Sequence, residues 1–322
     1  MSPKMTMAMP DAQMKAVLDQ LTMLKGKPIP KLSATEARKQ PGPTDAVKAL
    51  LKKQGKSTEP EVVAKVEDKT IESVPVRVYT PSGKGPFPVL VYFHGGGWVI
   101  ANIDAYDSSA RALANAAKCM VVSVGYREAP EYKFPAAPED SYKVTQWIMK
   151  NAKSMNGDPK HIAVGGESAG GNLATVVSMM SRDRKAKMPI YQLLVYPVTD
   201  HNFSRPSYIE NAMAKPLNKA MMSWFWNNYL KSPADEMNPY ASPMKAKSLK
   251  GLPPATIIGA EIDPLRSEGM AYSDRLKKAG IAVNYKLYKG VTHEFFGMTA
   301  VLDKSKDAIK FAATDLKKAF SK

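Results

Sequence analysis

Short apolar runs recur along most of the chain and alternate with amphipathic stretches. The runs predict strands at residues 71–79, 88–93, 120–124, 162–164, 191–195, 255–258 and 283–287. The amphipathic stretches predict helices at residues 108–117, 138–151, 169–182, 265–279 and 304–320. Apolar strands without strict alternation, separated by helices, indicate a mostly parallel sheet that is covered on both faces. The fold class is therefore α/β, with a doubly wound sheet.

Two parts of the chain depart from this rhythm. Residues 1–56 alternate helical pattern with proline-rich breaks, which predicts a helical cap rather than a part of the sheet. Residues 200–235 hold helical sequence rich in large apolar side chains and no predicted strand. Such a stripe is typical of a helix that faces the core, and it also fits a second piece of cap. We predict a cap segment at 1–56, a second cap insertion at 200–235, and a main domain at 57–199 and 236–322.

The composition is that of an ordinary globular protein. Hydrophobic residues make up 44% of the chain and charged residues 24%, and no apolar run approaches the ~20 residues of a membrane span. The net charge of +16 raises the question of a nucleic-acid partner, but the lysines are spread along the whole chain. We expect a solvated basic surface, no nucleic-acid partner and no stable membrane insertion.

Cys119 is the single cysteine, and it stands in an apolar run where a buried, inert thiol is expected. An internal disulfide is therefore excluded, which favours a cytoplasmic location. No sustained apolar segment precedes Pro10, as a secretory signal would require. A periplasmic or secreted location is the alternative, if a signal peptide has been removed.

A serine stands in a glycine-rich turn between an apolar strand and a helical pattern. The turn is Gly166-Glu-Ser-Ala-Gly170, and GxSxG at such a junction is typical of a nucleophile elbow. Glycines suit the first and last positions because side chains there would clash in so tight a turn. We predict that Ser168 is a nucleophile, and a purely structural turn is the alternative.

A serine nucleophile needs a base, and the chain has four histidines. His293 follows the strand predicted at 283–287, at the sheet edge where Ser168 is expected, and is therefore the predicted base. Asp263 follows the strand at 255–258 and completes the chain order Ser, Asp, His that α/β hydrolases show. Glu261 is the fallback acid, and Asp263 could instead cap the next helix.

Negative charge that develops on a substrate oxygen needs hydrogen-bond donors nearby. The run His94-Gly-Gly-Gly-Trp98 follows the strand at 88–93, and its glycines let backbone N–H groups approach a substrate. We predict an oxyanion hole from the N–H groups of Gly96, Gly97 and Ala169, with His94 as a structural hydrogen-bonding residue. The bulky side chains predicted to contact the acyl group of the substrate are Trp98, Trp224 and Phe225.

Five motifs together make the chain resemble the hormone-sensitive lipase family of esterases. They are HGGGW from His94, YREAPE from Tyr126, GESAGGN from Gly166, DPLRSEG from Asp263 and VTHEFFGM from Val291, in family order and spacing. The resemblance implies the α/β-hydrolase fold, with an eight-stranded, mostly parallel sheet and a helical cap built from the N-terminal segment and the insertion after strand six. It also implies no cofactor or metal, a preference for short to medium acyl chains, and homodimers in some members.

Three residues depart from the family pattern. Glu128 replaces the usual Leu, Ser267 the usual Asp, and Glu294 the Gly that is common after the histidine. None of the three removes a predicted catalytic group. We therefore expect a serine carboxylesterase that acts on a small-molecule ester through an acyl-enzyme. An amidase, lactonase or thioesterase with the same triad is the alternative, as is a non-catalytic ligand receptor on this fold.

Overall fold

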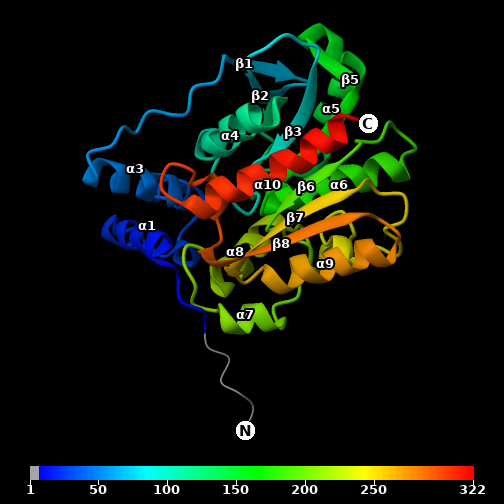
Figure 1. The fold of residues 1–322 in the computed structure, drawn as a ribbon. Coiled ribbons are helices and arrows are strands. Elements are labelled where there is room, and N and C mark those ends of the chain that lie inside the picture. Colours follow the sequence, from blue (N-terminus) through cyan, green and yellow to red (C-terminus); the bar gives the residue numbers. More distant parts are fainter. Residues whose placement is uncertain (1–6) are drawn as a thin grey trace.

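An eight-stranded sheet forms the centre of the computed structural model, which describes residues 7–322 (Figure 1). In spatial order the strands are β1 (Lys65–Ile71), β2 (Val74–Thr80), β4 (Met120–Val124), β3 (Phe87–Phe93), β5 (Gly157–Glu167), β6 (Gln192–Val195), β7 (Ala255–Ile262) and β8 (Val283–Thr292). Strand β2 runs antiparallel to β1 and β4, and the remaining pairs are parallel. The predicted mostly parallel, eight-stranded sheet is confirmed.

Strand β1 is the one strand that the apolar pattern did not predict. Its sequence, KVEDKTI, carries four charged residues, and most of the strand is exposed at the edge of the sheet. Charged side chains are common on edge strands because they discourage pairing with other chains. The prediction that a single strand begins at Ile71 was wrong, because Ile71 ends β1 and a turn at Glu72 and Ser73 leads into β2.

Helices cover both faces of the sheet. Helices α4 (Asp107–Ala117) and α10 (Asp303–Phe320) pack on one face, and α5 (Ala136–Asn151), α6 (Ala169–Asp183) and α9 (Arg266–Lys278) pack on the other. Strand β3 shows why its sequence is apolar throughout: Val89 and Val91 belong to one buried cluster, and Leu90 and Tyr92 to the other. Each such buried side chain contributes about 1.5–3 kcal/mol to the free energy of folding.

Two groups of helices lie outside this three-layered core. The first comprises α1 (Ala12–Met23), α2 (Ala34–Ala37) and α3 (Pro43–Lys53); the second comprises α7 (Pro206–Glu210) and α8 (Lys219–Tyr229). Short 3-10 turns complete the chain: η1 (Ile29–Lys31), η2 (Asp104–Tyr106), η3 (Ala152–Met155), η4 (Pro233–Met237), η5 (Pro243–Lys245) and η6 (Phe295–Gly297). Within residues 7–322, no helix combines the length and apolar character that a membrane crossing requires.

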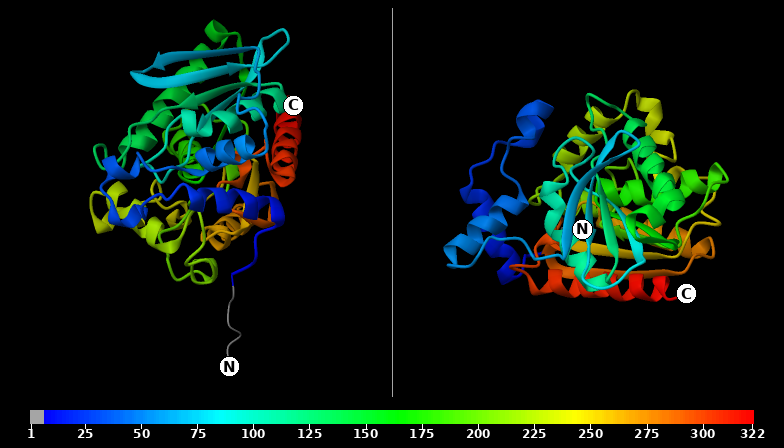
Figure 2. Two further views of the ribbon diagram at one scale, coloured as in Figure 1. Left: turned by 90° about the vertical axis from the view of Figure 1, so that its left-hand side faces the viewer. Right: turned by 90° about the horizontal axis from the view of Figure 1, so that it is seen from above.

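The two outer groups touch each other. Trp224 on α8 donates its indole N–H to the carbonyl oxygen of Leu32, 3.1 Å away, beyond the end of η1. Figure 2 shows the N-terminal helices, in blue, beside the yellow-green segment that holds α8. Residues 1–6 of the predicted cap segment lie outside the described residues. The helices lie where a two-part cap was expected, and the division into cap and main domain stays a prediction.

The strand ends position the candidate site. Strands β3, β5, β7 and β8 are parallel, so their carboxyl ends meet at one edge of the sheet. The HGGGW loop, Ser168, Asp263 and His293 follow these four strands directly. This is the edge at which open α/β sheets assemble ligand sites.

Candidate active site

Ser168 occupies a strained turn between β5 and α6. Its backbone has φ 58° and ψ −117°, a conformation that residues other than glycine rarely adopt. The neighbouring glycines make this turn possible, because a Cβ at Gly170 would lie 1.9 Å from the carbonyl oxygen of Phe93 and one at Gly166 would lie 2.4 Å from it. Strain of about 1–3 kcal/mol at a single residue is typical of a functional position.

Ser168, His293 and Asp263 form a continuous chain of hydrogen bonds. Nε2 of His293 lies 2.9 Å from Oγ of Ser168, and Nδ1 lies 2.7 Å from Oδ2 of Asp263. A carboxylate only accepts, so Nδ1 carries the proton and Nε2 is free to accept from the serine. Oδ1 of Asp263 also accepts the backbone N–H of Leu265 at 2.8 Å, so this aspartate both orients the imidazole and caps the chain after β7.

The other candidates for these positions lie elsewhere. Oε2 of Glu261, the fallback acid, accepts the backbone N–H of Gly290 at 2.7 Å. His161 pairs with Asp158, and His201 pairs with Glu236. Of the acids weighed from the sequence, it is therefore Asp263 that the fold places against His293.

The imidazole of His293 is buried in an acidic environment. Burial alone would lower its pKa, but the Asp263 carboxylate, with smaller contributions from Glu294 and Glu167, outweighs this effect and raises the pKa above its usual value. A stabilised imidazolium suits a base that must hold a proton transiently. The ring also packs against Tyr196, with 4.4 Å between ring centroids.

Gly96 and Gly97 line a cavity of about 460 Å³ together with Ser168 and His293. Both glycines have positive φ, +91° and +59°. A side chain at either position would collide with its surroundings: a Cβ at Gly97 would lie 2.2 Å from the ring of Phe225. Ala169 is the first residue of α6, next to the serine. The three backbone N–H groups of the predicted oxyanion hole thus belong to segments that adjoin Ser168.

His94 has a structural environment, as its sequence position suggested. It is buried and stacks on Tyr126, with 4.3 Å between the ring centroids. Burial lowers its pKa to about 4, so the ring is neutral near pH 7, and Nδ1 donates to the carbonyl oxygen of Gly95 at 2.8 Å. These contacts shape the glycine loop and leave His94 no part in the chain of hydrogen bonds at Ser168.

The predicted substrate contacts separate in the structure. Phe225 lines the active-site cavity, with Leu217 and Met221. Trp98 is fully buried and stacks on Tyr229 with 4.1 Å between centroids, and it is absent from the described residues that line the cavity. Trp224 is also absent from that lining, because its indole turns toward Leu32. The substrate contacts of Trp98 and Trp224 stay a prediction, and this geometry gives them no support.

Several residues that line the active-site cavity were not predicted from the sequence. The cavity wall includes Arg38, Thr44 and Asp45 from the N-terminal helices, together with Tyr106 and Glu128. Only Glu128 carried a signal, since it replaces the leucine usual in its motif. The others lie outside the family motifs. The folding of the N-terminal segment over the sheet edge brings Arg38, Thr44 and Asp45 to Ser168, and Tyr106 comes from η2 after β3.

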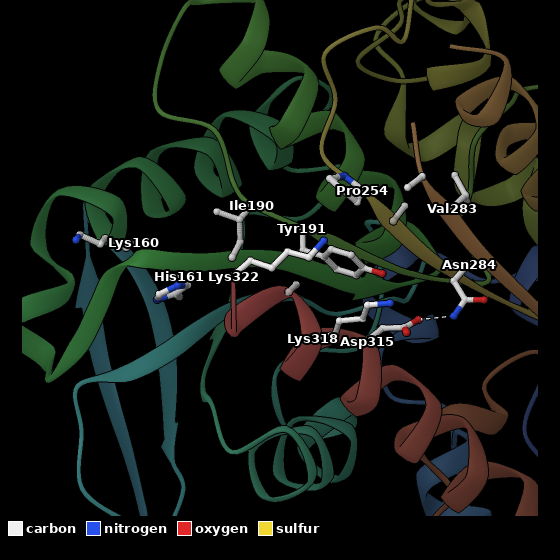
Figure 3. A pocket seen from close by; sticks show the side chains of 13 residues that line it. Lys160, His161, Ile190, Tyr191, Pro254, Val283, Asn284, Asp315, Lys318 and Lys322 are labelled. Atoms are coloured by element: carbon white, nitrogen blue, oxygen red, sulfur yellow. Dashed lines mark hydrogen bonds between the residues drawn. The ribbon is translucent and has the colours of Figure 1, made fainter. Parts of the chain in front are cut away.

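A depression of about 680 Å³ lies at the opposite, amino-terminal edge of the sheet (Figure 3). Its lining residues include Lys160, Tyr191, Pro254, Val283 and Lys318. Asp315 accepts a hydrogen bond from Asn284 there. None of the predicted catalytic residues lines this depression. Within residues 7–322, no group of three or more His, Cys, Asp or Glu side chains is placed to hold a metal ion.

Known proteins resemble this chain along most of its length. Residues 90–297 match a family model described as alpha/beta hydrolase fold. The ethyl acetate hydrolase of Pseudomonas putida is 34% identical over 288 residues, which cover 88% of this chain and 89% of that protein. Carboxylesterase NlhH of Mycobacterium tuberculosis is 37% identical over 274 residues, or 81% of this chain and 86% of that protein. A hyperthermophilic esterase from the archaeon Pyrobaculum calidifontis has a TM-score of 0.87 at 35% identity, covering 97% and 99% of the two chains.

Proposed function

The chain belongs to the hormone-sensitive lipase family of α/β hydrolases and is a carboxylic ester hydrolase, and on this premise we propose that Ser168, His293 and Asp263 form its catalytic triad. The observation that carries the proposal is the unbroken chain of hydrogen bonds from the Ser168 hydroxyl to the Asp263 carboxylate at the wall of a cavity. The arrangement matches the roles of nucleophile, base and orienting acid.

The reaction proceeds in two steps. Oγ of Ser168 attacks the ester carbonyl carbon while its proton moves to Nε2 of His293, and that proton then passes to the leaving alkoxide. Water attacks the acyl-enzyme in the same manner, which releases the acid and returns the proton to Ser168. Asp263 holds the imidazole in the required tautomer and stabilises its protonated form.

The oxyanion of each tetrahedral intermediate binds to the N–H groups of Gly96, Gly97 and Ala169. Their proximity to Ser168 and the positive φ of the two glycines support this role. Each donor that is aimed at the developing charge lowers the barrier by about 3 kcal/mol.

The size of the cavity favours short to medium acyl chains. Its volume is about 460 Å³, and Phe225, Leu217 and Met221 form an apolar part of its wall. Burial of each methylene of an acyl chain contributes about 0.8 kcal/mol until the cavity is filled. We therefore expect kcat/KM to rise over the first members of an acyl series and to fall for long chains.

A chain-length series of para-nitrophenyl esters, from acetate to dodecanoate, tests the proposal with wild type, Ser168→Ala and Ser178→Ala. Ser178 is a matched control, because it is a buried serine of the same helix whose hydroxyl bonds only to Ala174. Ser168→Ala should lose at least ~1,000-fold in kcat, and Ser178→Ala should keep most of its activity. Near-normal turnover by Ser168→Ala would contradict the assignment. A higher kcat/KM for matched anilides, lactones or thioesters would favour one of the alternative activities.

We also propose a cytoplasmic location. Cys119, the single cysteine, is buried, as expected of a protein that relies on no disulfide. Fractionation of the source cells tests this location, and recovery of the protein in the periplasmic or secreted fraction would contradict it.

A further inference from the structure

Glu294 is a second acidic side chain at the imidazole of His293. Its Oε1 lies 3.6 Å from Nε2, the same nitrogen that faces Ser168, and accepts the hydroxyl of Tyr106 at 2.7 Å. The side chain is one-fifth exposed. The two-step reaction described above gives this carboxylate no role.

The backbone of Glu294 is strained. Its φ is +71°, in the left-handed region that favours glycine. A side chain other than glycine costs about 1 kcal/mol in such a conformation. Glycine would relieve this cost, and residues that carry such strain cluster at functional sites.

Two cavities meet at the pair of Glu294 and Tyr106. Both residues line the active-site cavity, and both also line a second cavity of about 670 Å³. The wall of the second cavity includes three charged residues, Glu59, Arg111 and Lys306. Water is stable in such surroundings because it finds several hydrogen-bonding partners. Glu294 thus lies between a water-accessible cavity and the reacting serine.

Deacylation requires a water molecule within hydrogen-bonding distance of Nε2 of His293. Two polar atoms 3.6 Å apart can share one water at about 2.8 Å from each. We infer that Glu294 binds the attacking water of deacylation and that the second cavity supplies it. The inference rests on the proposed triad and assigns Glu294 a catalytic part in its second step.

The proton and bond balance of this step is complete without any further reactant. The water oxygen forms a bond to the acyl carbon, and the bond from that carbon to Oγ of Ser168 breaks. One water proton moves to Nε2 of His293 and from there to Oγ. The second water proton stays on the water oxygen, which becomes part of the acid product. Before the attack, this O–H donates a hydrogen bond to the carboxylate of Glu294.

An ionised carboxylate is the stronger acceptor for the water O–H, because its charge strengthens the hydrogen bond. Burial raises the pKa of Glu294, against the opposing effects of His293 and Tyr106, and Asp263 raises it further. Glu167 is also buried near Glu294. Burial and the charge of Glu294 raise the pKa of Glu167 to about 7. The test therefore runs at about pH 8, above the pKa of about 7 of Glu167.

Stopped-flow hydrolysis of para-nitrophenyl acetate separates the two steps in wild type and Glu294→Gln. The burst reports acylation and the steady state reports deacylation. Glu294→Gln should slow deacylation about tenfold or more while acylation changes less than about threefold, because only the second step uses the bound water. The product ratio with added methanol should shift from acid toward methyl ester.

Glu72→Gln is the matched control, because Glu72 is also a glutamate with positive φ, 51°, and is absent from the described residues that line either cavity. It should keep the wild-type ratio of deacylation to acylation. Titration of the active serine with a phosphonate ester measures the folded, competent fraction of each variant, so that misfolding is not read as slow chemistry. An equal slowing of both steps in Glu294→Gln, or no slowing of either, would overturn the inference.

Thr299→Trp tests the supply route, because Thr299 lines the second cavity and is absent from the described residues of the active-site wall. Filling this cavity should raise the methyl ester to acid ratio, and a wild-type ratio would contradict the route. If wild type forms no acyl-enzyme on Ser168 at all, the proposed triad fails instead, and that outcome is distinguishable from a failure of the role of Glu294.

Discussion

Glu128, which replaces the leucine usual in the family motif, places a carboxyl group in a buried position at the active-site cavity. Its Oε1 is buried without a hydrogen-bond partner among the described residues, and its Oε2 lies 3.6 Å from Nε of Arg38. Burial raises the pKa of Glu128 to about 7, although Arg38 opposes the shift. The sequence revealed the replacement of leucine, but the elevated pKa depends on tertiary burial that no local pattern encodes.

Glu128→Gln should change the pH dependence of stability. An acid whose pKa is raised in the folded state destabilises that state as pH increases from its ordinary pKa of 4.5 to about 7. The free energy of unfolding of Glu128→Gln, relative to wild type, should therefore increase by up to about 3 kcal/mol between about pH 5 and pH 8. Urea unfolding at both pH values measures the difference.

Glu67→Gln is the control for this comparison. The hydrogen bond from Lys65 lowers the pKa of Glu67, so its titration lies below the pH window. Its effect on stability should be the same at both pH values. A constant difference between Glu128→Gln and wild type would contradict the account of Glu128.

Gly97→Ala should impair catalysis beyond its effect on the backbone. The substitution adds about 1 kcal/mol of strain at positive φ, and the new Cβ would collide with Phe225 in the cavity. Gly55→Ala has the same kind of strain, with φ +66°, but open space around it. We expect a loss of at least about tenfold in kcat for Gly97→Ala and less than about twofold for Gly55→Ala. Similar kcat values for the two variants would argue against an oxyanion role for this loop.

At the scale of elements, one arginine joins the N-terminal helices to the glycine loop. Arg38, at the end of α2, donates to the carbonyl oxygens of Val99 and Ala129 and forms a bidentate pair with Glu131. Charge-assisted, bidentate hydrogen bonds are among the strongest in proteins. The link positions α2 over the cavity, and it could not be predicted because Arg38 stands in no motif.

Arg38→Ala should loosen the N-terminal helices without unfolding the sheet. We expect kcat/KM to fall about tenfold, since helices α2 and α3 supply part of the cavity wall, and trypsin to cleave faster within residues 12–53. Arg184→Ala, which removes an exposed bidentate pair with Glu139, is the control and should behave as wild type. Equal protease resistance of Arg38→Ala and wild type would show that the link is dispensable.

Across the whole molecule, apolar periodicity predicted the buried elements and failed at the surface. The apolar runs of the buried strands β3 and β4 predicted these strands, whereas the exposed, charged β1 has no apolar run. The triad residues were predicted because each directly follows a strand that the pattern identified. Trp98 stacks on Tyr229, and bulk alone could not tell whether its side chain would turn toward a cavity or pack in this way. The contacts of Arg38 with Glu131 and of Glu294 with Tyr106 join segments that are distant in sequence.

Covalent labelling tests the central claim most directly. Treatment with a para-nitrophenyl phosphonate, followed by peptide mass spectrometry, should find one adduct per chain, on the peptide that contains Ser168, with loss of activity in proportion to labelling. His293→Ala should label far more slowly, because Nε2 no longer accepts the proton of the serine at 2.9 Å. An adduct on another residue, or full activity after complete modification of Ser168, would contradict the account.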